Sequence, residues 1–394
     1  MAITRILLTD TVTGTWQNRF GLRPGDSLRL AGSPKWSVTK ETLRGGLSDG
    51  VDVVTIDNGA LAVAILPTRG MGVWHANYKG LRVGWNSPVE RPVHPAFVPV
   101  ESANGLGWLR GFNELVCRCG LTSNGPPGDD PQGSPLENPL PLHGRIANLP
   151  AHRVELLIDD DGPGTITLVG VIDEANVFGS NLRLTSSIST TAGSADFTIR
   201  DVAMNRSSRP AESQLLYHIN VGPPFLEAGS KLVAPAAEII PRDARAAEGA
   251  DNWETCGGPE AGYAEQVYFA KPLKNDRGES FALLRNAGGD KAVSVHFGTD
   301  RLPCLSLWKN TAAMEDGYVV GLEPATNFPN PRAFERAQKR VVSLGPGESY
   351  ETFVRVAVHD HLENVAAIEA IAGGMTNDKP PTVHRAPQQG WSPN

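Results

Sequence analysis

Two short segments carry a histidine beside groups that could help it move a proton or hold an oxygen-rich ligand. The first, Pro141-Leu-His-Gly-Arg145, places Arg145 two residues after His143, so an extended chain would turn both side chains to one face. Imidazole exchanges a proton near neutral pH, and a guanidinium offers fixed donors to ligand oxygens. A purely structural histidine fits the motif equally well, so this segment leaves both interpretations open.

The second segment alternates as a strand would. His218 and Asn220 fall on one face of residues 215–221, and Tyr217 and Ile219 fall on the other. A polar pair on one face of an otherwise apolar strand indicates either solvent or a polar cavity on that side.

A carboxylate ends a third apolar segment. Glu323 is followed by Pro324, which stops ladder pairing, and Gly321 on the same face is expected to leave room for a ligand. A carboxylate at such a strand end suits a general base. The alternative is a surface glutamate at a turn.

Several charged side chains stand in apolar or glycine-rich surroundings. Arg69, Glu114, Arg118 and Lys309 are of this kind. Because buried charges need partners, they are candidates either for ligand contacts or for internal salt bridges.

Two further residues are candidate ligand contacts. Trp308 could stack on the C–H face of a sugar or serve as an ordinary core residue, and Asn327 could contact a ligand or fix its own loop. The His359-Asp-His361 stretch is interpreted as a solvated strand exit, and no metal site is predicted. The sequence has no Gly-x-Ser-x-Gly nucleophile elbow.

The elements that must position these residues are mostly short strands. Asp57-Asn-Gly-Ala60 between the apolar runs 51–56 and 61–66 predicts a hairpin. Alternating apolar residues predict further strands, and a change of phase near Asp201 predicts a bulge. Many short strands with frequent turns favour a sandwich or barrel over βαβ units. The remaining strands are predicted at 165–169, 182–188, 195–204, 214–221, 280–284, 292–297, 304–308, 318–323 and 350–358.

The other parts of the chain are less regular. Residues 362–372 have helical periodicity, and the Gly373-Gly374 pair is expected to end that helix. Residues 1–375 are predicted to form one domain, followed by a flexible, polar tail at 376–394. The irregular stretch 86–150 is of the length at which loops are often functional.

Composition excludes some function classes. The 394 residues carry a net charge of −7 without a basic block, which argues against a nucleic-acid partner. No apolar run has the length of a membrane span, and the N-terminus lacks a signal-peptide pattern, so a cytoplasmic location is expected. The four cysteines match neither a zinc nor a redox motif, and Cys117 and Cys119 are interpreted as buried.

Taken in order, these motifs resemble the aldose 1-epimerase (galactose mutarotase) superfamily, and in detail its DUF4432 branch. The resemblance covers about residues 50 to 360. The segments that carry it are Leu66-Pro-Thr-Arg-Gly-Met-Gly72, Gly84-Trp-Asn-Ser-Pro88, Cys117-Arg-Cys-Gly-Leu121, Pro141-Leu-His-Gly-Arg145, Leu216-Tyr-His-Ile-Asn220 and Glu323-Pro-Ala-Thr-Asn-Phe-Pro329.

The resemblance implies an all-β fold, a galactose-mutarotase-like antiparallel β-supersandwich with few short helices and an open sugar cleft. It implies that His218 protonates the ring oxygen of a sugar, that Glu323 takes the proton of the anomeric hydroxyl, and that His143 binds and polarises the sugar. No metal or cofactor is required. Departures exist, because the aromatic-rich strand that ordinary galactose mutarotases carry after the first histidine is missing.

The function predicted is therefore a mutarotase acting on a monosaccharide. Arg69, Arg118, Arg145 and Lys309 form an unusually cationic set, which suggests an acidic sugar as the substrate. Two alternatives stay open: a lyase or isomerase of an oxidised sugar, and a non-catalytic carbohydrate-binding protein. Homo-oligomer formation is also left open.

Overall fold

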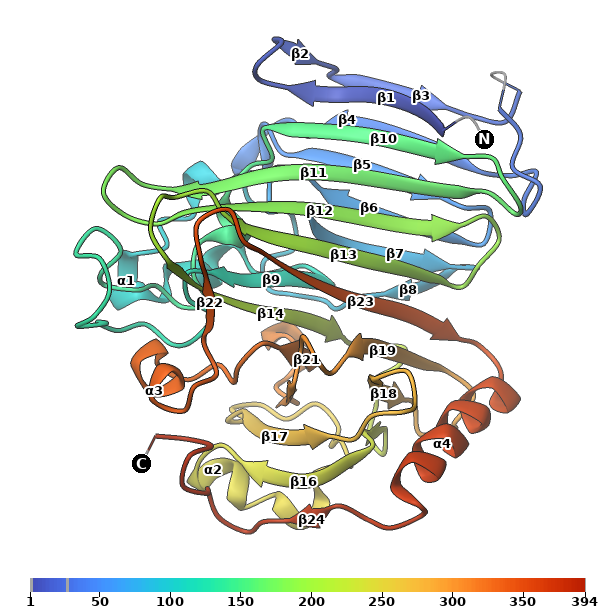
Figure 1. Cartoon of the computed structure of the whole chain (residues 1–394). Helices are drawn as coiled ribbons and strands as arrows, with labels where there is room; N and C mark the ends of the chain where they lie inside the picture. Colours follow the sequence, from blue (N-terminus) through green and yellow to red (C-terminus); the bar gives the residue numbers. More distant parts are fainter. Residues whose placement is uncertain (1–2, 26–27, 394) are drawn as a thin grey trace.

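Two large β-sheets form the body of the protein in a computed structural model that describes residues 3–25 and 28–393 (Figure 1). The named strand pairs are antiparallel apart from β16 and β24. The ten-stranded sheet has the order β15 (Lys231–Val233), β18 (Glu279–Arg285), β19 (Ala292–Gly298), β23 (Ser349–His359), β13 (Asp196–Asn205), β12 (Asn181–Thr191), β11 (Thr165–Ala175), β10 (Arg153–Asp159), β1 (Ile3–Asp10) and β2 (Thr15–Trp16).

The second sheet is longer and carries the polar strands singled out above. Two short strands pair with it at its side, β22 (Val342–Leu344) with β14 and β8 (Leu81–Val83) with β7. Its main order is β24 (Thr382–Val383), β16 (Ala236–Pro241), β17 (Gln266–Pro272), β20 (Cys304–Asn310), β21 (Val319–Ala325), β14 (Ala211–Val221), β9 (Val116–Leu121), β7 (Gly72–Tyr78), β6 (Leu61–Leu66), β5 (Asp52–Asp57), β4 (Ser37–Thr42) and β3 (Arg19–Leu22).

Helices are short and lie in the connections. The longest, α4, covers the predicted helical segment and runs through the glycine pair that was expected to end it. The α-helices are α1 (Ser102–Gly105), α2 (Ala244–Ala247), α3 (Arg332–Ala337) and α4 (Leu362–Thr376), and the 3₁₀ helices are η1 (Gly46–Ser48), η2 (Pro95–Phe97), η3 (Leu106–Gly111), η4 (Ile146–Asn148), η5 (Ala250–Asn252) and η6 (Met314–Asp316). Among the described residues no helix is both long and apolar enough to cross a membrane.

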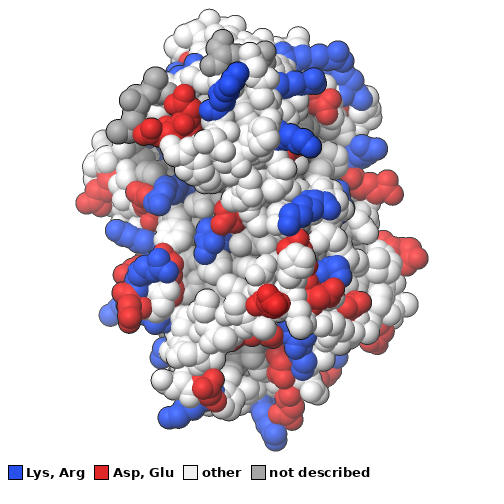
Figure 2. Space-filling model, turned by 90° about the vertical axis from the view of Figure 1, so that its right-hand side faces the viewer, with Lys and Arg blue, Asp and Glu red and all other residues white. Residues whose placement is uncertain are grey.

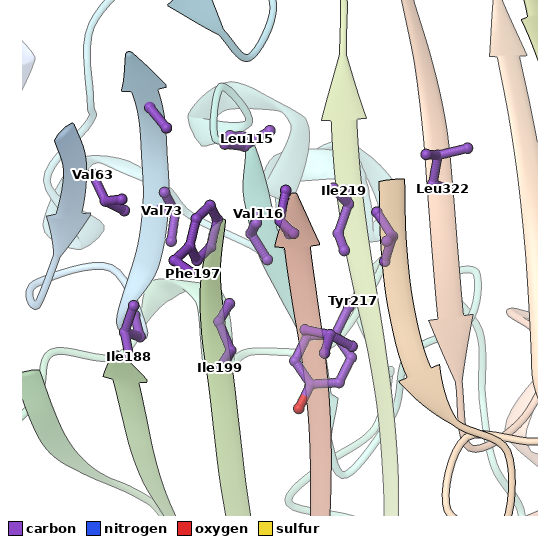
Figure 3. Close-up of a cluster of buried hydrophobic side chains, with 14 of the residues drawn as sticks. Val63, Val73, Leu115, Val116, Ile188, Phe197, Ile199, Tyr217, Ile219 and Leu322 are labelled. Atoms are coloured by element: carbon purple, nitrogen blue, oxygen red, sulfur yellow. The ribbon is translucent and has the colours of Figure 1, made fainter. Parts of the chain in front are cut away.

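The core lies between the two sheets. Figure 3 shows side chains from both sheets meeting there, among them Ile188 and Phe197 from one and Val73 and Ile219 from the other. The regular alternation of β11 and β12 turns every second residue inward, which is how a sheet with one buried face is built. The predicted all-β supersandwich and the 51–66 hairpin are confirmed.

The strand around Asp201 was predicted wrongly. β13 pairs with β12 and β23 without a register shift, so it has no bulge. Its inward residues include Asp201, which is fully buried. The apolar phase breaks because a buried carboxylate occupies an inward position, and not because the chain changes face.

The C-terminal residues 376–393, expected to be a flexible tail, pack against the body. β24 pairs with β16, and the Trp391 ring lies 5.1 Å from that of Phe328. The Asn330 side-chain amide donates to the Trp391 carbonyl at 2.8 Å. The half-buried Trp391 is an isolated aromatic residue in a polar, proline-rich stretch, which gives no periodic signal, so composition pointed to disorder. Residue 394 lies outside the described residues.

Charge on the molecular surface is mixed in sign. Figure 2 shows acidic and basic side chains interspersed over one face of the molecule. This mixture of signs is in keeping with the net charge of −7 for the whole chain.

Candidate active site

The polar face of the second sheet opens into a cavity of about 300 Å³. The irregular segment predicted to be functional supplies one side of it, and the ends of β14, β17, β20 and β21 supply the other. The three residues predicted to be catalytic line this cavity together. The lining residues are Leu106, Trp108, Leu109, Phe112, Pro126, Leu142, His143, His218, Arg242, Glu265, Val267, Trp308, Glu323 and Pro329.

His218 is held by the alternation of β14. Tyr217 and Ile219 point into the core between the sheets, so His218 and Asn220 point to the opposite side. Asn220 Nδ2 donates to the Glu114 carbonyl at 2.9 Å, and its Oδ1 lies 2.6 Å from His218 Nδ1. Because that amide oxygen can only accept, Nδ1 of His218 carries the proton and Nε2 is left with a lone pair in the neutral ring.

Burial makes His218 a weak base. Its side chain is 7% exposed, and desolvation, reinforced by the nearby His143, lowers its pKa from 6.5 to about 3. The ring is therefore neutral near pH 7.

Glu323 stands opposite this imidazole. β21 lies between β14 and β20, and places Glu323 Oε1 3.3 Å from His218 Nε2. The contact is close but is not a hydrogen bond, and Oε1 has no hydrogen-bond partner among the described residues. Burial, with a smaller contribution from the negative charge of Glu265, raises the pKa of Glu323 from 4.5 to about 8.

The pair therefore holds one proton over a wide pH range. Near pH 7 Glu323 is protonated and His218 is neutral, because burial disfavours the charged form of both groups. Moving that proton to His218 Nε2 would give an imidazolium facing a carboxylate with the same proton count. One group that can give a proton and one that can take it thus face a shared cavity.

His143 completes the cluster from a tight turn. Its backbone is left-handed, with φ of 56°, and its Nδ1 lies 2.8 Å from the Asn124 carbonyl, which must accept, so Nε2 again bears the lone pair. Its ring lies 5.5 Å from that of His218. Gly144 is required beside it, since a Cβ there would lie 2.2 Å from the Ser123 carbonyl oxygen. Burial lowers the pKa of His143.

The remaining wall contains Arg242 and Glu265, which the sequence did not single out, beside the predicted Trp308. Trp308 donates from Nε1 to Glu265 Oε2 at 2.7 Å. Glu265 also accepts from Arg242 Nη2 at 3.0 Å, and Arg242 Nε donates to Asp243 at 2.9 Å. Arg242 follows β16 and Glu265 precedes β17, where ordinary surface charges also occur, so no local pattern could have marked them.

Two of the predicted ligand-binding arginines lie inside the protein. Arg69, 1% exposed, forms an ion pair with Glu114 at 2.7 Å and donates to the Gly111 carbonyl at 2.9 Å. Arg118 is buried with Asp201 in the core. Neither arginine lines the cavity. Both form internal salt bridges, which was the second of the two interpretations that the sequence left open.

The other two basic residues are also engaged elsewhere. Lys309 points to the side of β20 opposite Trp308, and its Nζ donates to the Thr255 carbonyl at 2.7 Å. Arg145 contacts Glu101 at 3.3 Å and does not line the cavity, because the turn at Gly144 separates it from His143.

The two predicted asparagines lie behind the histidines. Asn220 holds His218, as described above. Asn327 exchanges hydrogen bonds with the side chain of Asn124, at 2.9 and 3.1 Å, and Asn124 in turn holds His143. Both asparagines are fully buried, so they position the imidazoles and do not line the cavity.

Comparison with known proteins places the chain in a family. A family model described as a domain of unknown function, DUF4432, matches residues 48–358. The chain belongs to the DUF4432 family. No curated protein matches this DUF4432 chain.

Solved structures agree with the fold. The DUF4432 chain is similar to the crystal structure of a "putative aldose 1-epimerase" from Klebsiella pneumoniae, with a TM-score of 0.93 and 33% identity over 98% of this chain and 99% of that one. A galactose mutarotase-like protein from Clostridium acetobutylicum has a TM-score of 0.55 and 16% identity over 82% and 98% of the two chains. A galactose mutarotase related enzyme from Lactobacillus acidophilus has a TM-score of 0.52 and 11% identity over 78% and 98%. The last two show a shared fold.

Gly321 has a different use from the one predicted. A Cβ at this position would lie 2.5 Å from Glu323 Oε1 and 3.1 Å from Trp308 Cβ. The space that was expected to receive a ligand is thus occupied by the catalytic candidate itself.

We expect Gly321→Ala to displace the Glu323 carboxyl and to slow the anomer exchange that the sequence resemblance predicts by about 10–10²-fold, because small misplacements of reacting groups are costly. Gly21→Ala is the matched control, since Gly21 also lies in a strand and an added Cβ meets nothing within 4 Å. The measurement is the rate of anomer exchange by NMR. Equal rates in the two variants would contradict this account of Gly321.

Proposed function

We propose that this DUF4432 protein is an aldose 1-epimerase that opens and recloses a sugar ring with His218 and Glu323. The observation that supports it most strongly is the 3.3 Å approach of His218 Nε2 and Glu323 Oε1 at the wall of a cavity. His143, 5.5 Å from His218 between ring centres, would hold a sugar hydroxyl. The similarity to the Klebsiella protein points in the same direction.

The reaction balances with the single proton of the pair. The unprotonated member of the pair accepts the proton of the anomeric hydroxyl while the bond from C1 to the ring oxygen breaks. The protonated member donates its proton to the ring oxygen. Rotation about C1–C2 presents the other face of the aldehyde, and the reverse transfers close the ring. Since the pKa values place the proton on Glu323 in the free protein, Glu323 is the donor and His218 the acceptor in the opening step, the reverse of the roles that the resemblance implies.

The charge of the cavity favours a neutral sugar. Arg69, Arg118, Arg145 and Lys309, which suggested an acidic substrate, all have internal partners and lie outside the cavity. Arg242 is the one Lys or Arg among the described lining residues, and Glu265 and Asp243 already neutralise it. An anionic sugar would meet Glu265 without a free cation.

The test is anomer exchange by NMR across neutral and acidic sugars. We expect acceleration with a neutral aldose and weaker binding of the corresponding uronate. Saturable binding without acceleration for every sugar would overturn the mutarotase proposal and favour a lyase, an isomerase of an oxidised sugar, or a binding protein.

The pH profile gives a second expected result. The reaction needs one proton on the pair, which is lost as pH rises through the pKa of about 8 of Glu323. A second proton joins only near the pKa of about 3 of His218. We therefore expect kcat/KM to be flat from about pH 5 to 7 and to fall about tenfold per unit above pH 8. A decline that begins at pH 6.5, the ordinary pKa of histidine, would contradict this assignment.

A further inference from the structure

The C-terminal residues 382–391, which we call the strap, contact elements that supply the walls of the cavity. β24 pairs with β16 (Figure 1), and Arg242, the first residue after β16, lines the cavity. Further along the strap, the Gly390 carbonyl accepts from Arg340 Nη1 at 2.8 Å. The strap is therefore anchored to the body of the protein near both of its ends.

Trp391 anchors the loop that follows Glu323. Its ring lies 5.1 Å from that of Phe328, and its carbonyl accepts from Asn330 Nδ2 at 2.8 Å. Phe328 and Asn330 are both buried, and Pro329 between them lines the cavity. Trp391 therefore holds the residues on either side of a lining residue.

The same loop packs against the turn that carries His143. A Cβ on Gly125 would lie 2.0 Å from the Asn330 carbonyl oxygen, so the two backbones are in direct contact and a side chain at 125 would clash. The side chains of Asn327 and Asn124 are hydrogen-bonded to each other. His143 Nδ1 donates to the Asn124 carbonyl at 2.8 Å, and its backbone N–H donates to the Gly125 carbonyl at 2.9 Å. Movement of the loop would therefore affect both bonds that fix His143.

The two other members of the candidate site are held by the sheet itself. His218 lies in β14 and Glu323 lies in β21. β14 pairs with β9 and β21, and β21 also pairs with β20. Because ladder pairing on both sides fixes these strands, we expect a change in the strap to reach His143 first.

We propose that Trp391 is a positioning residue, which holds His143 in place through the loop at 326–331 and so sets the affinity of the cavity for its sugar. The proposal rests on the proposed function, in which His143 holds a sugar hydroxyl. Because His218 and Glu323 carry the proton transfers, loss of the Trp391 ring should weaken binding more than it slows the chemistry. A mutation that removes binding shared by the substrate and the transition state raises KM and leaves kcat unchanged.

The experiment compares KM and kcat for anomer exchange of glucose and galactose, measured by NMR. In Trp391→Ala we expect KM to rise about fivefold or more and kcat to stay within about twofold of the wild type. Trp391→Phe keeps a ring against Phe328 and the backbone carbonyl for Asn330, so it should keep the wild-type KM. An unchanged KM in Trp391→Ala, or a fall in kcat as large as the fall in kcat/KM, overturns the proposal.

A half-buried aromatic residue on the other sheet supplies the control. Tyr350, in β23, packs against the main core, and its hydroxyl donates to the Arg301 carbonyl at 2.8 Å. Tyr350→Ala also removes a large ring, so it should lower the unfolding temperature while KM stays within about twofold of the wild type. An equal rise in KM in Tyr350→Ala and Trp391→Ala would mean that KM follows stability alone, and this result overturns the proposal.

A second readout needs no catalysis. In protein with isotope-labelled histidine, the imidazole NMR signals of His143 and His218 are assigned by their loss in His143→Gln and His218→Gln. Trp391→Ala should shift the His143 signals more than those of His218, because the loop packs against the turn that holds His143. A shift of His143 without exchange of any sugar by the wild type supports the positioning role and overturns the mutarotase function. Exchange by the wild type together with unshifted His143 signals in Trp391→Ala does the opposite.

Discussion

Glu323→Gln is expected to lower the maximal rate of anomer exchange by about 10²–10⁴-fold, the usual contribution of a positioned acid or base. The amide has nearly the same shape as the carboxyl group, so it keeps the 3.3 Å approach to His218 Nε2 but cannot pass a proton to the sugar ring. The rate is measured by NMR with saturating aldose. A change of less than about threefold would remove Glu323 from the chemistry.

The same variant separates function from stability. With a pKa of about 8 in the folded protein against 4.5 for the free side chain, Glu323 must take up a proton on folding at neutral pH. The required proton uptake lowers the free energy of unfolding. This loss of stability grows as pH rises from about 4.5 to 8, by about 1.4 kcal/mol per pH unit at most. Glutamine carries no such cost, so Glu323→Gln should unfold at a higher temperature than the wild type at pH 8.

A matched control is available on the surface. Glu369, on α4, pairs with Arg285 and its side chain is 35% exposed. Glu369→Gln should change neither the exchange rate nor, beyond about 1 kcal/mol, the stability. A loss of activity in this control would mean that the assay reports folding and not chemistry.

The sequence was sufficient to predict the strand that carries His218. Alternation in β14 correctly separated His218 and Asn220 from the core-facing Tyr217 and Ile219, because a strand with one buried face has a strict period of two. The resemblance carried by the order of the motifs then predicted that His143 and Glu323 share a site with His218, and all three line one cavity. No local pattern encodes such a long-range arrangement.

The charged residues could not be placed in the same way. A charge in an apolar segment indicates burial with a partner, but it does not say whether that partner is a ligand or the protein itself. Arg69 and Arg118 form ion pairs with Glu114 and Asp201 inside the protein. Lys309 points away from its neighbour Trp308 because successive side chains in a strand alternate. Arg242 and Glu265 reach the cavity only through the packing of β16 beside β17.

The clearest example of this ambiguity is the ion pair between Arg118 and Asp201, which also has the largest expected effect on stability. Both side chains are fully buried. Arg118 also donates to Ser186 Oγ and to the Met71 carbonyl, each at 2.6 Å. Tyr217, whose hydroxyl is drawn in Figure 3, donates to Asp201 at 2.9 Å. The network joins β9, β12, β13 and β14, so it connects the two sheets across the core.

Asp201→Asn should destabilise the protein by about 3–5 kcal/mol, because it leaves the Arg118 guanidinium buried without a counter-charge. The measurement is the free energy of unfolding in urea at neutral pH. The neighbouring residue supplies the control. Arg200 lies on the outer face of β13 and pairs with Glu351 of the adjacent strand β23, and the two side chains are 61% and 56% exposed. Glu351→Gln should cost no more than about 1 kcal/mol.

A double variant distinguishes the cost of an unpaired charge from the cost of lost packing. Arg118→Met combined with Asp201→Leu removes both charges and keeps apolar volume, so its destabilisation should be smaller than the sum of the two single variants. Simple addition of the two effects would mean that the charges do not interact, and that the carbonyl and hydroxyl contacts of Arg118 alone hold the sheets at this point. Tyr217, the residue before His218, donates to Asp201, so the exchange rate of each folded variant then reports how far the proposed acid–base pair depends on this connection between the sheets.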